Sequence, residues 1–405
     1  MVNEMSAQPV GELAPPAGYN EDLARADKEL ARLERRRQDH PGDIQCRVTL
    51  LYRMYHRTLL TGRISELDGV ETGILESIQE FGPREDLCLL KANLDLHLYR
   101  LAETRRDLEM APLLSGRFEG RVLLADIDFQ EGRYESARME LERLIEERRE
   151  WDNLARLAYW KSKFGQADEA DALYTEAEDE LTAKQMRSYA WLEVHRGLLD
   201  FKRGRYADAR IHYQRAEEGY PGYWHTSEHI AELLAAEQKF DEAISILEDV
   251  AARTGKPELL QTIGELYIVS GRKERAQPWL DQAHVAYLDS VRRGGVHYFH
   301  HLADLYVDVR ENPEEALRWA RRDFELRSNF STQAALAWVL YRTGLVHEGL
   351  KYMHMALASG VQDARVFSTA AELFATAGQP DAAAEFRKTA FRINPVHDNF
   401  HVHHS

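Results

Sequence analysis

Histidine and carboxylate side chains recur at one spacing in three neighbouring segments of this chain. In each segment a first position is followed by one three residues later and another four residues after that, and eight of the nine positions are His, Asp or Glu. The nine residues are His225, Glu228 and Glu232; Glu258, Gln261 and Glu265; and His297, His300 and Asp304. Residues three and four apart share one face of a helix. Imidazole and carboxylate groups together are ligands for divalent transition metals such as Zn, Ni, Fe or Mn.

Two interpretations of these stripes stay open. In the first, His300, Asp304 and Glu265, with His297 beside them and His225 nearby, form a site for a divalent metal. In the second, they line a polar groove and hydrogen-bond one another or a basic group of a partner. Neither an HExxH motif nor a CxxC pair supports the metal interpretation.

A second group of histidines lies in the last ten residues, 396–405. This group is His397, His401, His403 and His404. A short His-rich tail can capture a divalent metal simply by the density of its ligands. The alternatives are an ordinary flexible terminus or a remnant of expression design.

The elements that position the stripes are helical hairpins that recur along the chain. An Ala or Gly on the first helix is followed, twelve or thirteen residues later, by a second small residue. The first set is Ala125, Ala158, Gly197, Ala231, Gly264, Ala303, Ala337 and Ala371, and the second is Ala137, Ala170, Ala209, Ala243, Ala276, Ala316, Gly349 and Ala383. Two antiparallel helices approach closely only where one of them lacks bulk. Steps of 33 to 39 residues are typical of a solenoid in which each hairpin needs its neighbours to bury its apolar face.

These positions resemble those of the tetratricopeptide-repeat family. The matches include Leu260, Ile263, Gly264, Tyr267, Gly271, Ala276, Leu280 and Ala283; Gly197, Gly204, Ala209, Tyr213, Ala216 and Pro221; and Ala371, Phe374, Gly378, Ala383, Ala390 and Pro395. Eight such repeats are expected over residues 118–395. The resemblance implies an all-α, right-handed superhelical solenoid of antiparallel helix pairs, with a concave groove that binds a protein or peptide.

The amino-terminal part is more irregular. Residues 1–20 are rich in Pro, Gly and Ala, and we expect them to be flexible. Residues 21–117 are expected to form one charged helix followed by degenerate hairpins, because Ala92 has the spacing of a repeat position but the turn glycine is missing.

The family offsets also predict which aromatic and cationic side chains face the groove. They are Tyr159, Lys163, Trp191, Phe201 and Lys202 in the middle of the solenoid, and Trp338, Tyr341 and Arg342 near its end. Trp and Tyr dominate the energetics of many interfaces. Packing between repeats is the alternative, since aromatic residues at helical spacing commonly belong to the core.

Composition excludes several classes of function. A formal net charge of −16 disfavours nonspecific binding to nucleic acid or an anionic membrane. We find no secretory signal, no apolar run long enough for a membrane span and no nucleotide-binding or hydrolase motif. Cys46 and Cys88 lie in apolar helical runs, which predicts buried free thiols in a reducing compartment. The sequence therefore favours a cytoplasmic, non-catalytic scaffold without a cofactor, with a metal-binding protein or metal-dependent enzyme as the alternative.

Overall fold

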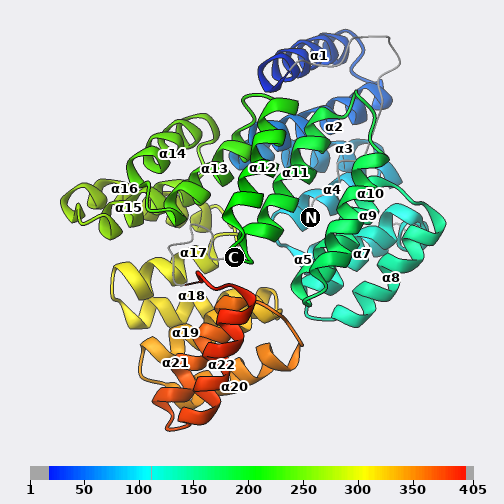
Figure 1. Cartoon of the computed structure of the whole chain (residues 1–405). Helices are drawn as coiled ribbons and strands as arrows, with labels where there is room; N and C mark the ends of the chain where they lie inside the picture. Colours follow the sequence, from blue (N-terminus) through cyan, green and yellow to red (C-terminus); the bar gives the residue numbers. More distant parts are fainter. Residues whose placement is uncertain (1–17, 111, 398–405) are drawn as a thin grey trace.

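A computed structural model describes residues 18–110 and 112–397 of the chain, and within these residues every regular element is a helix (Figure 1). The amino-terminal helices are α1 (Tyr19–Asp39), α2 (Ile44–Thr61), α3 (Leu67–Phe81), α4 (Glu85–His97), α5 (Leu101–Met110) and α6 (Pro112–Gly116), with a 3-10 turn at Ile64–Glu66. The charged helix expected at the start is thus α1.

Eight helical hairpins follow, and they are the ones that the recurring small residues predict. They pair α7 (Phe118–Gln130) with α8 (Tyr134–Glu147), α9 (Trp151–Lys163) with α10 (Ala167–Asp179), α11 (Met186–Phe201) with α12 (Tyr206–Gly219), α13 (Trp224–Ala236) with α14 (Phe240–Thr254), α15 (Pro257–Val269) with α16 (Lys273–Arg292), α17 (Phe299–Asp304) with α18 (Pro313–Leu326), α19 (Phe330–Arg342) with α20 (Val346–Ala358), and α21 (Ala364–Thr376) with α22 (Pro380–Ile393). The all-α solenoid is confirmed.

The small residues lie where the paired helices cross. A methyl group added to Gly264 would be 2.6 Å from Cγ of Leu280 on the partner helix. Ala276 is only 2% exposed, and Ala209, Ala243 and Ala383 are completely buried. Close helix contact therefore explains why these positions repeat.

The turn of each hairpin needs a residue with positive φ. Gly271 adopts a φ of +79° at this position. Among the described residues, three that are not glycine also have positive φ: Tyr99 (+58°), Gln238 (+63°) and Glu311 (+48°). Tyr99 follows Ala92 by the same seven residues that separate Gly271 from Gly264. The degenerate hairpin thus keeps the repeat geometry without the glycine, against the steric preference of L-residues.

One hairpin contains an additional residue. The small residues Ala303 and Ala316 are thirteen apart, whereas the other seven pairs are twelve apart. A π-helical segment at Leu305–Val309, which directly continues α17, takes up the extra residue. Single π-turns of this kind are frequent near functional sites, and this one follows the stripe that contains His300.

The superhelix completes a turn and closes on itself. At the first contact, the amide of Tyr19 donates to the carbonyl of Pro221 at 3.1 Å, and the indole of Trp224 donates to the carbonyl of Leu60 at 2.8 Å. These bonds join α1 and α2 to the start of α13.

The same closure continues through the later repeats. The Asn329 side-chain amide donates to the carbonyl of Gln130, 199 residues away in sequence, and the amide of Phe330 donates to the hydroxyl of Tyr134. The amide of Gln362 donates to the carbonyl of Lys163 at 2.8 Å. We call this line of contacts the seam. Because the seam joins successive turns, the concave surface surrounds a space between them, which stays partly open to solvent.

Two further features of the described residues are the environment of the cysteines and the apolar character of the helices. Cys46 and Cys88 are free thiols, 3% and 2% exposed, in separate core clusters. Across residues 18–110 and 112–397, none of the helices combines the length and apolar character that a membrane crossing requires.

Candidate binding chamber

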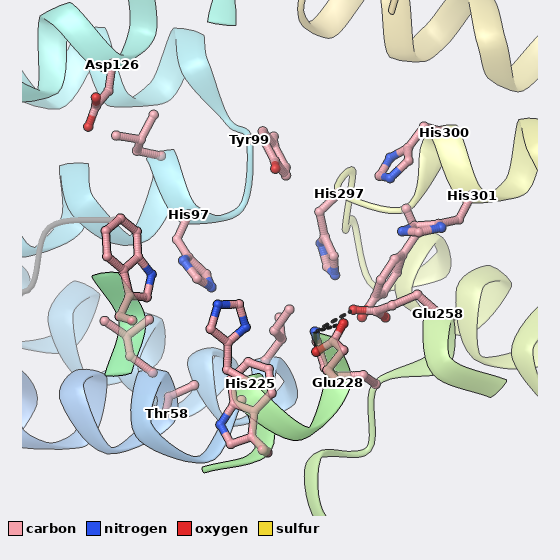
Figure 2. A pocket seen from close by; sticks show the side chains of 18 of the residues that line it. Thr58, His97, Tyr99, Asp126, His225, Glu228, Glu258, His297, His300 and His301 are labelled. Atoms are coloured by element: carbon pink, nitrogen blue, oxygen red, sulfur yellow. Dashed lines mark hydrogen bonds and ion pairs between the residues drawn. The ribbon is translucent and has the colours of Figure 1, made fainter. Parts of the chain in front are cut away.

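The enclosed space contains a cavity of about 470 Å³. We call it the chamber. Residues from α2, α4, α7, α9, α11, α13, α15 and α17 and their adjoining turns line it, so both ends of the closed turn contribute to its wall. Figure 2 shows that His97 and His225 point toward each other across it, and that His297, His300 and His301 approach from another side.

The three stripes predicted from the sequence converge on this chamber. Seven of their nine members line it: His225 and Glu228 of α13, Glu258, Gln261 and Glu265 of α15, and His297 and His300 beside and on α17. The other two, Glu232 and Asp304, lie outside its lining. The first two positions of each stripe thus line the chamber.

Burial favours the neutral form of three chamber histidines, His97, His225 and His297. It lowers the pKa of His97 from 6.5 to about 4, with a further contribution from nearby His297. It likewise lowers the pKa of His297 to about 4, and that of His225 well below its usual value. At neutral pH each ring therefore carries one nitrogen with a free lone pair and one N–H.

Several polar atoms of the chamber wall have no hydrogen-bond partner within the described part of the chain. They are Nδ1 of His97, Nε2 of His225, Nδ1 of His297 and Oε2 of Glu258, and all four atoms are buried. A buried polar atom without a partner costs about 1 to 3 kcal/mol. Because their four residues line one cavity, this cost is concentrated in the chamber wall.

Lys256 is the central cation of the chamber. Its ammonium lies 3.0 Å from Glu228 and 3.5 Å from Glu258, as the dashed lines in Figure 2 show. The same ammonium lies over the ring of Trp224, 4.7 Å from the ring centre. Burial alone would lower the pKa of Lys256, but the two carboxylates outweigh it and raise the pKa.

A second cation of the wall, Arg156, is also held by two carboxylates. It is only 2% exposed and lies 3.1 Å from both Asp126 and Asp152. The pKa of Arg156 is raised because these carboxylates outweigh the effect of burial.

The metal site expected from the stripes is not formed. Among the described residues, no three His, Cys, Asp or Glu side chains have the arrangement of a metal-binding group. His300 instead accepts a hydrogen bond at Nδ1 from the guanidinium of Arg327 at 3.1 Å, and this positive charge opposes a dication on the same ring. In the tail, Nδ1 of His397 is 3.0 Å from the carbonyl of Asn394. His401 and His403 lie outside the described residues.

The predicted aromatic and cationic positions divide among different surroundings. Trp191 lines the chamber and stacks on His195, with ring centres 3.6 Å apart. Tyr159 and Lys163 lie at the seam, since Tyr159 contacts Phe129 and the carbonyl of Lys163 accepts from Gln362.

Other predicted groove residues do not line the chamber. Phe201 is completely buried in the core, because its ring packs on Tyr206, so it does not form a groove wall. Burial lowers the pKa of Lys202. On α19, Trp338 and Arg342 both contact Asp308, and the ring of Tyr341 lies 5.4 Å from that of Trp338. These α19 residues lie outside the chamber lining.

Sequence reasoning missed several residues of the chamber wall, among them His97, Tyr99, Trp151, Trp224 and Lys256. Tyr99 carried a detectable signal, because it takes the turn position of a hairpin with no glycine. Trp151 and Trp224 are the first residues of α9 and α13, and Lys256 directly precedes α15, so all three lie just before the positions that the offsets selected.

The comparisons with known proteins give structural similarity only. The matching structures include a tetratricopeptide repeat protein from Parabacteroides merdae, at 17% identity over 60% of this chain and 93% of that one, with a TM-score of 0.37. A Cut9–Hcn1 hetero-tetramer of the APC/C matches at 15% identity over 95% and 76% of the two chains, with a TM-score of 0.49. A human IFIT1 dimer with PPP-AAAA matches at 14% identity over 91% and 95%, with a TM-score of 0.44. No family model matches the sequence, and no curated protein matches it significantly.

The described helices define a helical-repeat solenoid whose inner surface lines the chamber. Its hairpins, the small residues where the helices cross and the turn positions with positive φ are those of a tetratricopeptide-like helical solenoid fold.

Proposed function

We propose that the protein is a non-catalytic interaction scaffold that binds a short segment of a partner protein inside the chamber. The observation that carries the proposal is the chamber, whose lining includes His97, His225, His297 and Glu258, each with a buried polar atom that has no partner among the described residues. A ligand that hydrogen-bonds to them would recover part of their desolvation cost on binding.

The size of the chamber limits what can enter. A volume of about 470 Å³ falls within the range of about 300 to 1,000 Å³ that is usual for ligand pockets. The chamber is therefore large enough for a few residues, or for a long side chain with its flanking backbone.

The chemistry of the lining favours binding over turnover. The lining contains neither Ser nor Cys, and the hydroxyl of Thr262 donates to the carbonyl of Glu258 at 3.0 Å. General acid–base catalysis works best with a pKa near the working pH. His97 and His297 titrate near 4, so they are poor proton-transfer groups at neutral pH.

A displayed peptide library selected against the full-length protein tests the proposal. Selected peptides should lose on the order of 2 kcal/mol or more in affinity for Trp191→Ala, because this ring lines the chamber. Trp338→Ala is the matched control, since it removes the same side chain outside the chamber lining, and binding should be retained.

Circular dichroism and the urea midpoint of each variant establish that the fold is intact before affinities are compared. If Trp338→Ala abolishes binding while folded Trp191→Ala leaves it unchanged, the partner lies elsewhere and the proposed function is wrong.

A further inference from the structure

The chamber wall has an excess of negative charge. Its charged members are two cations, Arg156 and Lys256, and five carboxylates, Asp126, Asp152, Glu228, Glu258 and Glu265. Apart from the histidines, the formal charge of the lining is −3. A concave wall of this sign attracts cations and repels anions, because charges interact more strongly where bulk water is partly excluded.

Neither cation of the lining is available to an anionic ligand. Lys256 already lies between Glu228 and Glu258, and Arg156 lies between two aspartates. A phosphate or carboxylate ligand would have to break one of these buried ion pairs, which leaves a buried charge uncompensated. An anion is therefore opposed both by the net charge and by the pairing.

The partnerless atoms favour the same sign of ligand. Oε2 of Glu258 can only accept a hydrogen bond while the carboxylate is ionised, and a neutral imidazole offers one accepting nitrogen. His97, His225 and His297 each contribute one such ring. A lysine ammonium has three donors and an arginine guanidinium has five, and neither accepts hydrogen bonds.

Basic groups of both kinds lie in the wall or beside it: Lys256 belongs to the lining, and Arg327, outside the lining, contacts His300 and Tyr99. The ammonium of Lys256 combines two carboxylates with the face of Trp224. The guanidinium of Arg327 combines a hydrogen bond to His300 with the face of Tyr99, 4.3 Å from the ring centre. Carboxylate, neutral imidazole and aromatic face are the surroundings that stabilise a buried cation.

We propose that the chamber recognises a basic side chain, lysine or arginine, of the partner segment. This inference rests on the proposed function and adds the chemistry of the ligand. The incoming cation interacts with the net negative charge of the lining beside Glu258, and it donates to the accepting nitrogens of His97, His225 and His297.

Amino-acid amides of one backbone and different side chains test this chemistry on the full-length protein. The probes are the N-acetyl amides of lysine, arginine, norleucine and glutamate, titrated calorimetrically at low ionic strength. At least one basic amide should bind about tenfold more tightly than the norleucine amide, which has the same aliphatic stem without the ammonium. The glutamate amide should bind more weakly still.

Charge-neutralising variants of equal shape assign the binding to the chamber. Glu258→Gln should lower the affinity for the basic amide about fivefold or more. Glu242→Gln, at an exposed position on α14, should leave this affinity unchanged. Equal or tighter binding of the norleucine or glutamate amide, or no saturable binding of either basic amide, overturns the inference. In that event the library selection with Trp191→Ala still decides separately whether the chamber binds partner segments.

Discussion

Replacing His225 with Phe should make the free protein more stable. Its Nε2 atom is buried without a hydrogen bond, and its ring is surrounded by other rings, with Trp224 at 5.4 Å and His229 at 4.7 Å between centres. Phe keeps the ring shape and removes the desolvated nitrogen. Since a buried polar atom without a partner costs about 1 to 3 kcal/mol, the free energy of unfolding should rise by a similar amount, less any cost of the slightly larger ring.

The matched control is His229→Phe, one turn later on the same helix. His229 lies 3.0 Å from Glu232, which is completely buried. Its replacement removes a partner of a buried carboxylate, so the free energy of unfolding should fall by about 1 to 3 kcal/mol. The same substitution thus has opposite effects at two positions on one helix, and urea denaturation followed by circular dichroism measures both.

The binding assay completes this comparison. His225→Phe should lower the affinity for the selected peptides even though it stabilises the free protein, because in our account this nitrogen hydrogen-bonds to the bound ligand. If His225→Phe destabilises the chain as much as His229→Phe does, His225 is a structural residue and the reasoning about partnerless atoms is refuted.

Three further expectations concern pH, the seam and a turn. The free energy of unfolding should fall as the pH decreases from 6.5 towards 4. The pKa values of His97 and His297 are lowered in the folded protein, so in this range only the unfolded chain takes up protons at these residues. The loss is about 3 kcal/mol per histidine, and urea titrations at several pH values measure it. A pH-independent stability would contradict the neutral histidines. Asn329→Asp keeps the helix cap of α19 but removes the donor to Gln130, so the free energy of unfolding should fall by about 1 to 3 kcal/mol. Asn312→Asp changes a helix cap away from the seam and should leave this free energy nearly unchanged. Equal effects of the two substitutions would indicate an open superhelix. Gln238→Gly should raise the thermal midpoint by relieving a positive φ of +63°, worth about 0.5 to 1 kcal/mol, and a lower midpoint would show that the side chain matters more than the backbone.

The repeating hairpins could be predicted because their cause is local. Ala276 must be small where two helices cross, and the turn residue seven positions after Gly264 must adopt positive φ. Both constraints act within one hairpin, so they leave a pattern at fixed spacing. The convergence of three neighbouring stripes follows from the same spacing.

The closure could not be predicted in this way. Asn329 and Gln130 meet across 199 residues, and their contact depends on a small rotation per repeat that accumulates over the whole turn. For the same reason, offsets within a repeat assigned Trp338 to the same inner surface as Trp191, although only Trp191 lines the chamber. The metal hypothesis depended on side-chain directions, which spacing does not determine. His300, for example, contacts the guanidinium of Arg327, a residue outside the stripes.

A structure of the full-length protein with a library-selected peptide tests the central claim most directly. Our account predicts that the peptide enters the chamber and that a lysine or arginine side chain lies near Glu258 and Glu265, within hydrogen-bond distance of at least one of the nitrogens on His97, His225 and His297. A peptide bound on the outer surface, or one that directs an acidic side chain into the chamber, would contradict the account.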